Sequence, residues 1–141
     1  MPYRFLDHTA DVAFEAWGTS LEELFQSAAE ALLHTMIENP ETVRKETRRV
    51  LRLENPALDL LLFDLLQELI YFKDAEGLLL LPRHLAAAAD ELSWRIEGEL
   101  AGEALDPERH EQGVDVKAVT LHRFEVGETP DGWRCHVILD V

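Results

Sequence analysis

The chain has 141 residues, which is enough for one domain with a buried core. It carries 28 acidic residues against 13 lysines and arginines, giving a formal net charge of −15. Affinity for nucleic acids comes mostly from basic side chains that neutralise phosphates, so this balance argues against direct binding to RNA or DNA. It permits binding to a metal ion, a cationic ligand or a basic protein surface. We expect a single acidic domain over residues 1–141.

Cysteine content and hydrophobicity indicate the cell compartment. The one cysteine, Cys135, allows neither an intrachain disulfide nor a cysteine-based zinc site, and we interpret it as a core residue rather than a nucleophile. The most hydrophobic stretch, residues 58–81, is interrupted by charged side chains, which excludes a membrane span. Residues 1–4 lead into no uninterrupted apolar segment, so we expect no signal peptide. A cytoplasmic location fits these features.

The first elements follow from hydrophobic spacing. Alternating residues predict strands at 3–6 and 11–17. Ser20 and Glu23 have the spacing of a capping box, in which each side chain accepts a hydrogen bond from a free N–H at the helix start. Apolar residues then recur at steps of three and four, which predicts a helix that ends before Pro40.

The middle of the chain contains a basic segment and a second helix. Residues 43–54 alternate in part and carry arginines and a lysine, which predicts a long strand with a basic face. We favour a solvated face offset by neighbouring acids over a nucleic-acid contact. Asn55 and Pro56 predict an N-cap and a first helical residue, and the broad apolar face that follows predicts the central helix of the core, ending near residues 73–74. Glu68 lies in this helix, and we expect it to be exposed.

The second half of the chain has mainly strand patterns. We expect a buried strand at 78–81 ending at Pro82, an extended or irregular segment at 84–90, a polar connection at 106–113, and strands at 92–98, 114–126 and 133–139. The sequence Thr129-Pro130-Asp131-Gly132 predicts a hairpin turn. This order predicts an α+β fold, with two helices packed on a largely antiparallel β-sheet.

Oxygen-bearing side chains gather near both ends of the sequence. Asp7, His8 and Asp11 precede the second predicted strand, while Asp140 and the terminal carboxylate of Val141 follow the last one. We predict that these two ends meet. Carboxylates without thiolates favour a hard cation such as calcium, magnesium or manganese. A turn in which Asp and Thr side chains cap backbone N–H groups explains the first cluster equally well, and the residues do not separate Asp7 from Asp11.

Other constellations are weaker. The six histidines are scattered, and no pair has the spacing of metal ligands on one helix. His122 and His136 lie on adjacent predicted strands, where facing side chains are more often structural than metal-binding. Glycine-rich phosphate loops and nucleophile elbows are absent from the sequence. The case for an enzyme is therefore thin.

Several motifs, in order, give the chain its resemblance to the archease family. They are His8-Thr9-Ala10-Asp11-Val12, Ala16-Trp17-Gly18, Ser20-Leu21-Glu22-Glu23-Leu24-Phe25, Gln67-Glu68-Leu69-Ile70-Tyr71, Val116-Lys117-Ala118-Val119-Thr120-Leu121-His122 and Val137-Ile138-Leu139-Asp140-Val141. The resemblance covers nearly the whole chain. Leu121 is a departure, because the family usually has an aromatic residue before the histidine; we expect changed packing there rather than lost function.

The resemblance implies a function and a site. Archeases are accessory proteins that assist the GTP-dependent RNA-splicing ligase in tRNA splicing and RNA repair, promoting ligase guanylylation and multiple turnover. The family binds a divalent cation, with calcium seen, through residues that correspond to Asp11, Asp140 and Val141. On this basis the expected partner is the ligase protein, with little direct contact to RNA, and Lys117 is a candidate accessory contact.

Two alternatives remain beside the ligase activator. One is a chaperone-like adaptor for RNA-modifying enzymes, in which a bound metal is purely structural. The other is a metal-dependent hydrolase that uses Asp11, Asp140 and His8 with a metal-activated water. An activator turns over neither phosphoesters nor nucleotides by itself, which separates it from the hydrolase.

Overall fold

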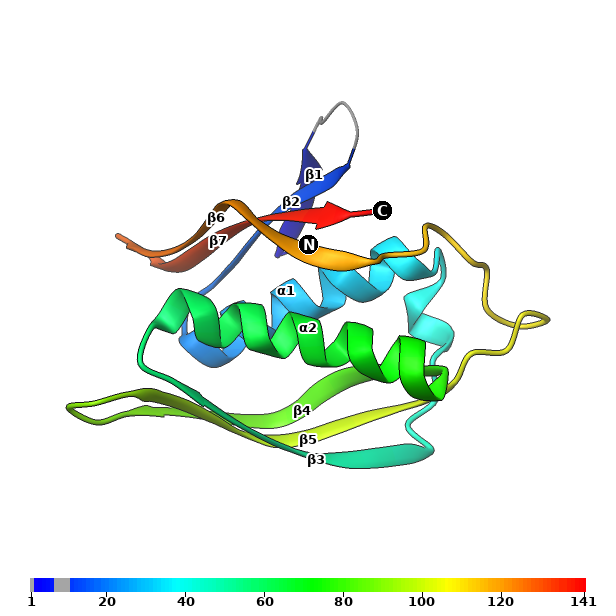
Figure 1. The fold of residues 1–141 in the computed structure, drawn as a ribbon, viewed down its shortest axis with the longest axis horizontal. Coiled ribbons are helices and arrows are strands. Elements are labelled where there is room, and N and C mark those ends of the chain that lie inside the picture. The colour runs from blue at the N-terminus through cyan, green and yellow to red at the C-terminus, as the bar shows by residue number, and fades with distance from the viewer. Residues whose placement is uncertain (1, 7–10) are drawn as a thin grey trace.

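Both helices lie between two antiparallel sheets in the computed structural model, which describes residues 2–6 and 11–141 (Figure 1). The elements are β1 Tyr3–Leu6, β2 Val12–Gly18, α1 Leu21–Met36, a 3₁₀ helix η1 Pro40–Thr42, β3 Thr47–Asn55, α2 Leu58–Glu76, β4 Leu78–Ala89, β5 Trp94–Ala104, β6 Ala118–Thr129 and β7 Gly132–Asp140. One sheet has the order β1-β2-β7-β6 and the other β3-β5-β4.

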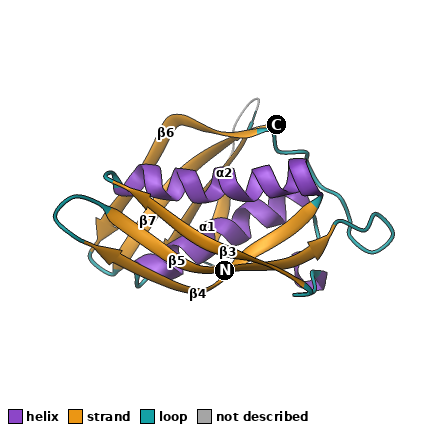
Figure 2. Ribbon diagram, turned by 60° about the horizontal axis from the view of Figure 1, so that its bottom comes forward, coloured by secondary structure: helices purple, strands orange, loops and turns teal. Residues whose placement is uncertain are grey.

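The α+β fold class predicted from the sequence is confirmed, and the strands that are described pair antiparallel. The division into two sheets was not predicted, because alternation gives the buried face of a strand but not its neighbours. Figure 2 shows the helices crossing between the two sets of strands. Within the described residues, no helix is long and apolar enough to cross a membrane.

The core fills the space between the helices and the two sheets. Phe25 and Leu32 of α1 and Leu62 and Leu66 of α2 are each at most 1% exposed. Because both sheets contact the helices, α2 buries a wide part of its surface, as its broad apolar face predicted. Phe14 of β2 is fully buried in the same cluster.

The first residues of α1 and α2 are stabilised in different ways. At α1 the Ser20 hydroxyl accepts a hydrogen bond from the Glu23 N–H at 3.1 Å, and Glu23 Oε2 accepts one from the Thr19 N–H at 2.7 Å, which confirms the capping box. The prediction for α2 was wrong by two residues. Asn55 is the last residue of β3, and its side chain accepts a hydrogen bond from the Ala57 N–H at 3.0 Å, so the helix begins at Leu58.

The predicted end of the strand at Pro82 was also wrong. β4 continues through Pro82 to Ala89, which confirms the extended reading of residues 84–90. Proline is tolerated because β4 is an edge strand and its outer side needs no N–H for a ladder. A bulge between Arg83 and Ala86 accommodates His84 at a φ of 55°.

Other strand boundaries also differ from the predicted ones, and three of them shift by four residues or more. β3 begins at Thr47 rather than at residue 43, because residues 43–46 form an irregular segment between η1 and the strand. β5 runs to Ala104 instead of ending at residue 98, and β6 begins at Ala118 instead of residue 114. Pairing with a neighbour extends or shortens each strand beyond what its own alternation indicates.

The basic face of β3 is offset by acids, as we favoured. Arg48 lies 2.5 Å from Glu99 of β5, and Arg49 lies 2.8 Å from Glu76 of α2. Arg52 pairs with Glu97 at 3.5 Å. These exposed pairs contribute little stability individually, but they remove the concentrated positive charge that binding to phosphates requires.

Candidate functional site

The pairing of β2 with β7 brings the two ends of the sequence to one end of the four-stranded sheet. Val12 is opposite Leu139 in the register. Asp11 immediately precedes Val12 and Asp140 immediately follows Leu139, so both aspartates lie at that end of the strand pair, beside the C-terminus marked in Figure 1. The prediction that these segments meet is confirmed at the level of the backbone. Asp7 and His8 lie outside the described residues.

The last strand is held firmly up to its final residues. The Lys117 N–H donates a hydrogen bond to the carbonyl oxygen of Asp140 at 2.8 Å. Val141 is partly buried and packs against the core, as does Val12. The carboxylate side chain of Asp140 is exposed, and Asp11 is half-buried. Two aspartates and a main-chain carboxylate on docked strands are hard oxygen donors, the ligand type that calcium and magnesium take.

Within residues 2–6 and 11–141, no group of three or more His, Cys, Asp or Glu side chains is arranged so that it could hold a metal ion. The donor set suggested by the sequence has two such side chains and a main-chain carboxylate. Of the accessory candidates, Glu68 is half-buried in α2, against the exposed position expected. Lys117 has an exposed side chain, and its backbone contacts Asp140.

Two residues of α2 hold the segment that contacts Asp140. Gln67 Oε1 accepts a hydrogen bond from the Val119 N–H at 2.9 Å. Lys73 Nζ donates to the Val116 carbonyl oxygen at 2.6 Å and to Asp115 at 2.8 Å. Burial alone lowers the pKa of Lys73, but hydrogen bonds to the carboxylates of Asp115 and Asp74 outweigh it, so the pKa lies above its ordinary value.

A groove at the opposite end of the same strands was missed in the sequence. It has a volume of about 780 Å³, and its lining includes Trp17, Trp133 and Glu15. Gly18 pairs with Trp133 at this end, so the groove lies roughly 20 Å along β2 from Asp11, at about 3.3 Å per residue. Trp17 is 39% exposed.

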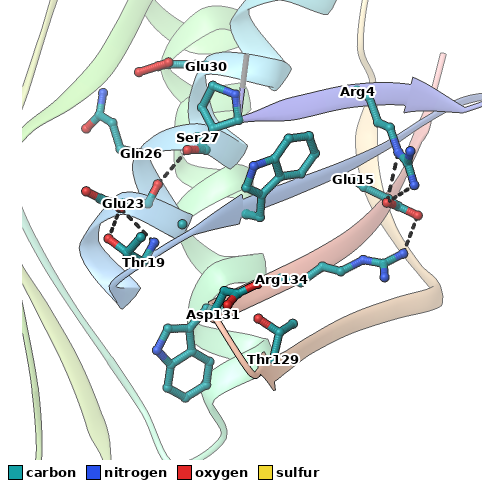
Figure 3. Close-up of a pocket in the computed structure, with 14 residues that line it drawn as sticks. Arg4, Glu15, Thr19, Glu23, Gln26, Ser27, Glu30, Thr129, Asp131 and Arg134 are labelled. Carbon is teal, nitrogen blue, oxygen red and sulfur yellow. Dashed lines mark hydrogen bonds and ion pairs between the residues drawn. The ribbon is translucent and has the colours of Figure 1, made fainter.

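On one side of this groove, Glu15 binds two arginine side chains (Figure 3). Its carboxylate accepts hydrogen bonds from Arg4 Nη2 at 2.9 Å and from Arg134 Nη2 at 2.5 Å. Burial raises the pKa of Glu15, but the hydrogen bonds from Arg134 and Arg4 outweigh burial and lower it. The three residues come from β1, β2 and β7, and their pairing depends on a register that the sequence does not reveal.

A buried ionic cluster holds the connection between β5 and β6. The sequence predicted only that residues 106–113 of this connection are polar. Glu103 is 5% exposed and binds Arg109, while its Oε2 also lies 3.1 Å from His110 Nε2. His110 Nδ1 accepts a hydrogen bond from the Asp106 N–H at 2.9 Å, so Nε2 carries the proton donated to Glu103. The Arg109 guanidinium is the main cause that lowers the pKa of Glu103 to about 2.

The remaining single candidates have structural roles. Glu125, not His122, is opposite His136, because the register of β6 shifts between Thr120 and Glu125. The ring of His136 donates from Nδ1 to the carbonyl oxygen of Arg123 at 2.8 Å. Cys135 is buried, and burial raises the pKa of its thiol to about 12, as expected for a core residue rather than a nucleophile.

The chain is similar to known proteins over nearly its whole length. Residues 3–141 match the Archease protein family (MTH1598/TM1083). The chain is similar to the protein archease of Pyrococcus abyssi, with 35% identity over 96% of this chain and 95% of that protein. It is 34% identical to the protein archease of Methanosarcina acetivorans, over 99% of this chain and 95% of that protein.

Two solved structures share the fold. The solution structure of protein 1598 of Methanobacterium thermoautotrophicum has a TM-score of 0.85 and 31% identity, and the match covers 99% of both chains. The crystal structure of an archease from Thermotoga maritima, described as a possible chaperone, has a TM-score of 0.59 and 22% identity over 96% of this chain and 94% of that one. The second likeness concerns the fold alone.

Proposed function

Since this chain belongs to the archease family, we propose that it is a cytoplasmic accessory protein that stimulates the GTP-dependent RNA-splicing ligase. In this role it promotes guanylylation of the ligase and multiple turnover in tRNA splicing and RNA repair. The observation that carries the proposal is the family match, which spans residues 3–141 together with the motifs at both ends. It performs no ligation itself.

The proposal includes a divalent cation bound by Asp11, Asp140 and the carboxylate of Val141, with calcium favoured and magnesium or manganese as alternatives. The β2–β7 register supports it, because it brings both aspartates to the same end of the sheet. Val141 is docked against the core, which lowers the entropy lost on binding. When bound, the cation supplies a compact positive charge at an acidic surface.

The charge distribution supports a protein partner over RNA. The net charge is −15, and the arginines of β3 are offset by glutamates. An acidic surface attracts a basic protein surface and repels a phosphate backbone. The chain therefore acts on the ligase protein and leaves RNA binding to it.

The ligase reaction at fixed metal and GTP concentration tests this function. Wild-type protein should raise multiple turnover of RNA ends, whereas Asp11→Asn and Asp140→Asn should weaken that stimulation at least about tenfold. Glu91→Gln removes an exposed acid in the loop between β4 and β5 and should stimulate like wild type. Equal stimulation by wild type and both aspartate variants would refute the site, and no stimulation by wild type would refute the function.

A chaperone-like adaptor is the second candidate, because the archease from Thermotoga maritima is described as a possible chaperone. In that case the cation has a structural role. Asp140→Asn would then lower the melting temperature of the protein without changing ligase turnover. Measuring both quantities on the same variant separates the two functions.

A further inference from the structure

The start of β6 has a free edge that α2 covers. In the order β1-β2-β7-β6, β6 pairs with β7 on one side only. Figure 1 shows α2 running beneath β6, and the two elements are in contact. On this side the Val119 N–H donates to Gln67 Oε1 at 2.9 Å, and the Val116 carbonyl oxygen accepts from Lys73 Nζ at 2.6 Å. Side chains of α2 thus satisfy backbone groups that an open edge would leave for water.

The segment held by α2 is the same segment that holds Asp140. Lys117 lies between the two anchored residues, and its N–H donates to the Asp140 carbonyl oxygen at 2.8 Å. Ala118 is opposite Asp140 in the register, and Val119 is opposite Leu139. A continuous set of hydrogen bonds therefore runs from α2 through residues 116–119 to the backbone of Asp140.

Lys73 is placed as a fixed anchor. Its side chain is 10% exposed, and its ammonium group lies 2.8 Å from both Asp74 and Asp115. The two carboxylates offset its charge, so it can approach an acidic site without strongly repelling a cation there. Val116, whose carbonyl it binds, has a fully buried side chain.

We propose that Gln67 and Lys73 are positioning residues for the cation site, because they fix the backbone segment against which Asp140 is held. This inference rests on the proposed binding of a divalent cation by Asp11, Asp140 and Val141. Outer partners that orient the ligands of a metal typically change metal affinity 10- to 100-fold when they are removed, although they never touch the ion. Gln67 and Lys73 act on Asp140 in the same way but one step further out, through the backbone of residues 116–119.

Calorimetric titration of calcium into the metal-free full chain tests the proposal. Gln67→Leu and Lys73→Met should each weaken calcium binding about tenfold or more. Gln67→Glu, which keeps an acceptor oxygen, and Lys73→Arg, which keeps a cationic donor, should retain most of the affinity. Lys45→Met is the matched control, because it removes the same charge from an exposed position before β3 and should bind calcium like wild type.

Amide hydrogen exchange on the metal-free proteins separates positioning from general destabilisation. In Gln67→Leu and Lys73→Met, exchange at the Lys117 amide should accelerate, while amides in β3 and β5 keep their wild-type rates. Wild-type affinity in both variants would overturn the inference, and so would tighter calcium binding by Lys73→Met than by Lys45→Met. A wild-type chain that binds no divalent cation would refute the proposed cation site together with this inference, whereas the ligase assay with wild-type protein tests the proposed function separately.

Discussion

Among single residues, Glu103 shows how a buried charge can be compensated. Its carboxylate accepts hydrogen bonds from the Arg44 N–H at 2.6 Å and from Arg109 Nη1 at 2.8 Å, and it also contacts His110. These donors come from the segment before β3 and from the loop after β5. One acid of β5 therefore holds two connections that are distant in sequence against the β3-β5-β4 sheet.

We predict that Glu103→Gln destabilises the protein by about 3 kcal/mol, because the mostly buried guanidinium of Arg109 loses its nearest charged partner. Urea unfolding at neutral pH measures the difference. Glu91→Gln, the same change on an exposed acid, should alter stability by less than about 0.5 kcal/mol. A loss of the same small size in both variants would contradict the structural role of Glu103.

The same carboxylate predicts a pH dependence. Its folded-state pKa of about 2 lies below the ordinary value of 4.5, so ionised Glu103 favours the folded protein. This stabilisation is complete above pH 4.5 and is lost as pH falls toward 2. The stability difference between wild type and Glu103→Gln should therefore shrink across that window. A constant difference across the window would show that the carboxylate is not held in this way.

Among the elements, the ladder between β4 and β5 depends on close backbone approach at Gly102. Gly102 is opposite Leu80, and a Cβ at this position would lie 1.7 Å from the Leu79 carbonyl oxygen. Gly127 on β6 is a natural comparison, since nothing lies within 4 Å of a Cβ built there among the described residues.

Gly102→Ala should therefore destabilise the protein by about 3 kcal/mol, as overpacking against a backbone atom that cannot rotate away requires the strands to separate. Gly127→Ala should be neutral or slightly stabilising, because it reduces the freedom of the unfolded chain without a clash. Thermal unfolding of both variants checks the prediction. Equal melting temperatures would contradict the tight approach of β4 to β5.

Local signals predicted the elements better than non-local ones. The capping box located the start of α1 because both of its hydrogen bonds form within five residues. Asn55 gave the wrong start for α2 because its side chain accepts a hydrogen bond from the Ala57 N–H while its backbone remains in β3. Pro82 gave the wrong end for β4, because a proline can lie within a strand at the edge of a sheet, and only the strand order reveals that β4 is such a strand. Clusters that depend on register, such as Arg4, Glu15 and Arg134, could not be predicted for the same reason.

For the molecule as a whole, the proposed cation would join residues from the two ends of the described fold, since Asp11 precedes β2 and Asp140 ends β7. The sequence predicted this meeting because the acids flank two alternating strands. It did not predict the groove at Trp17, which lies at the opposite end of the same two strands.

Calcium at 100 times its dissociation constant should stabilise the folded chain by about 2.7 kcal/mol, which raises the melting temperature on the order of 10 °C. A chelator should reverse the shift, and Asp11→Asn should abolish most of it. Scanning calorimetry with and without calcium measures these changes. A shift of wild-type size in Asp11→Asn would place the bound ion elsewhere.

The pairing of β2 with β7 also determines when the fold can be completed. Residues 21–104 contain both helices and the whole β3-β5-β4 sheet, so these elements can associate while the chain is still being synthesised. β2 is made early and pairs with β1, which precedes it, yet its other partner, β7, is synthesised only after the β3-β5-β4 sheet and β6. Contacts between residues so distant in sequence form late and slowly. Until β7 is made, the edge of β2 that it covers remains open to other chains, which makes the interval before β7 is synthesised the period of greatest aggregation risk for this protein.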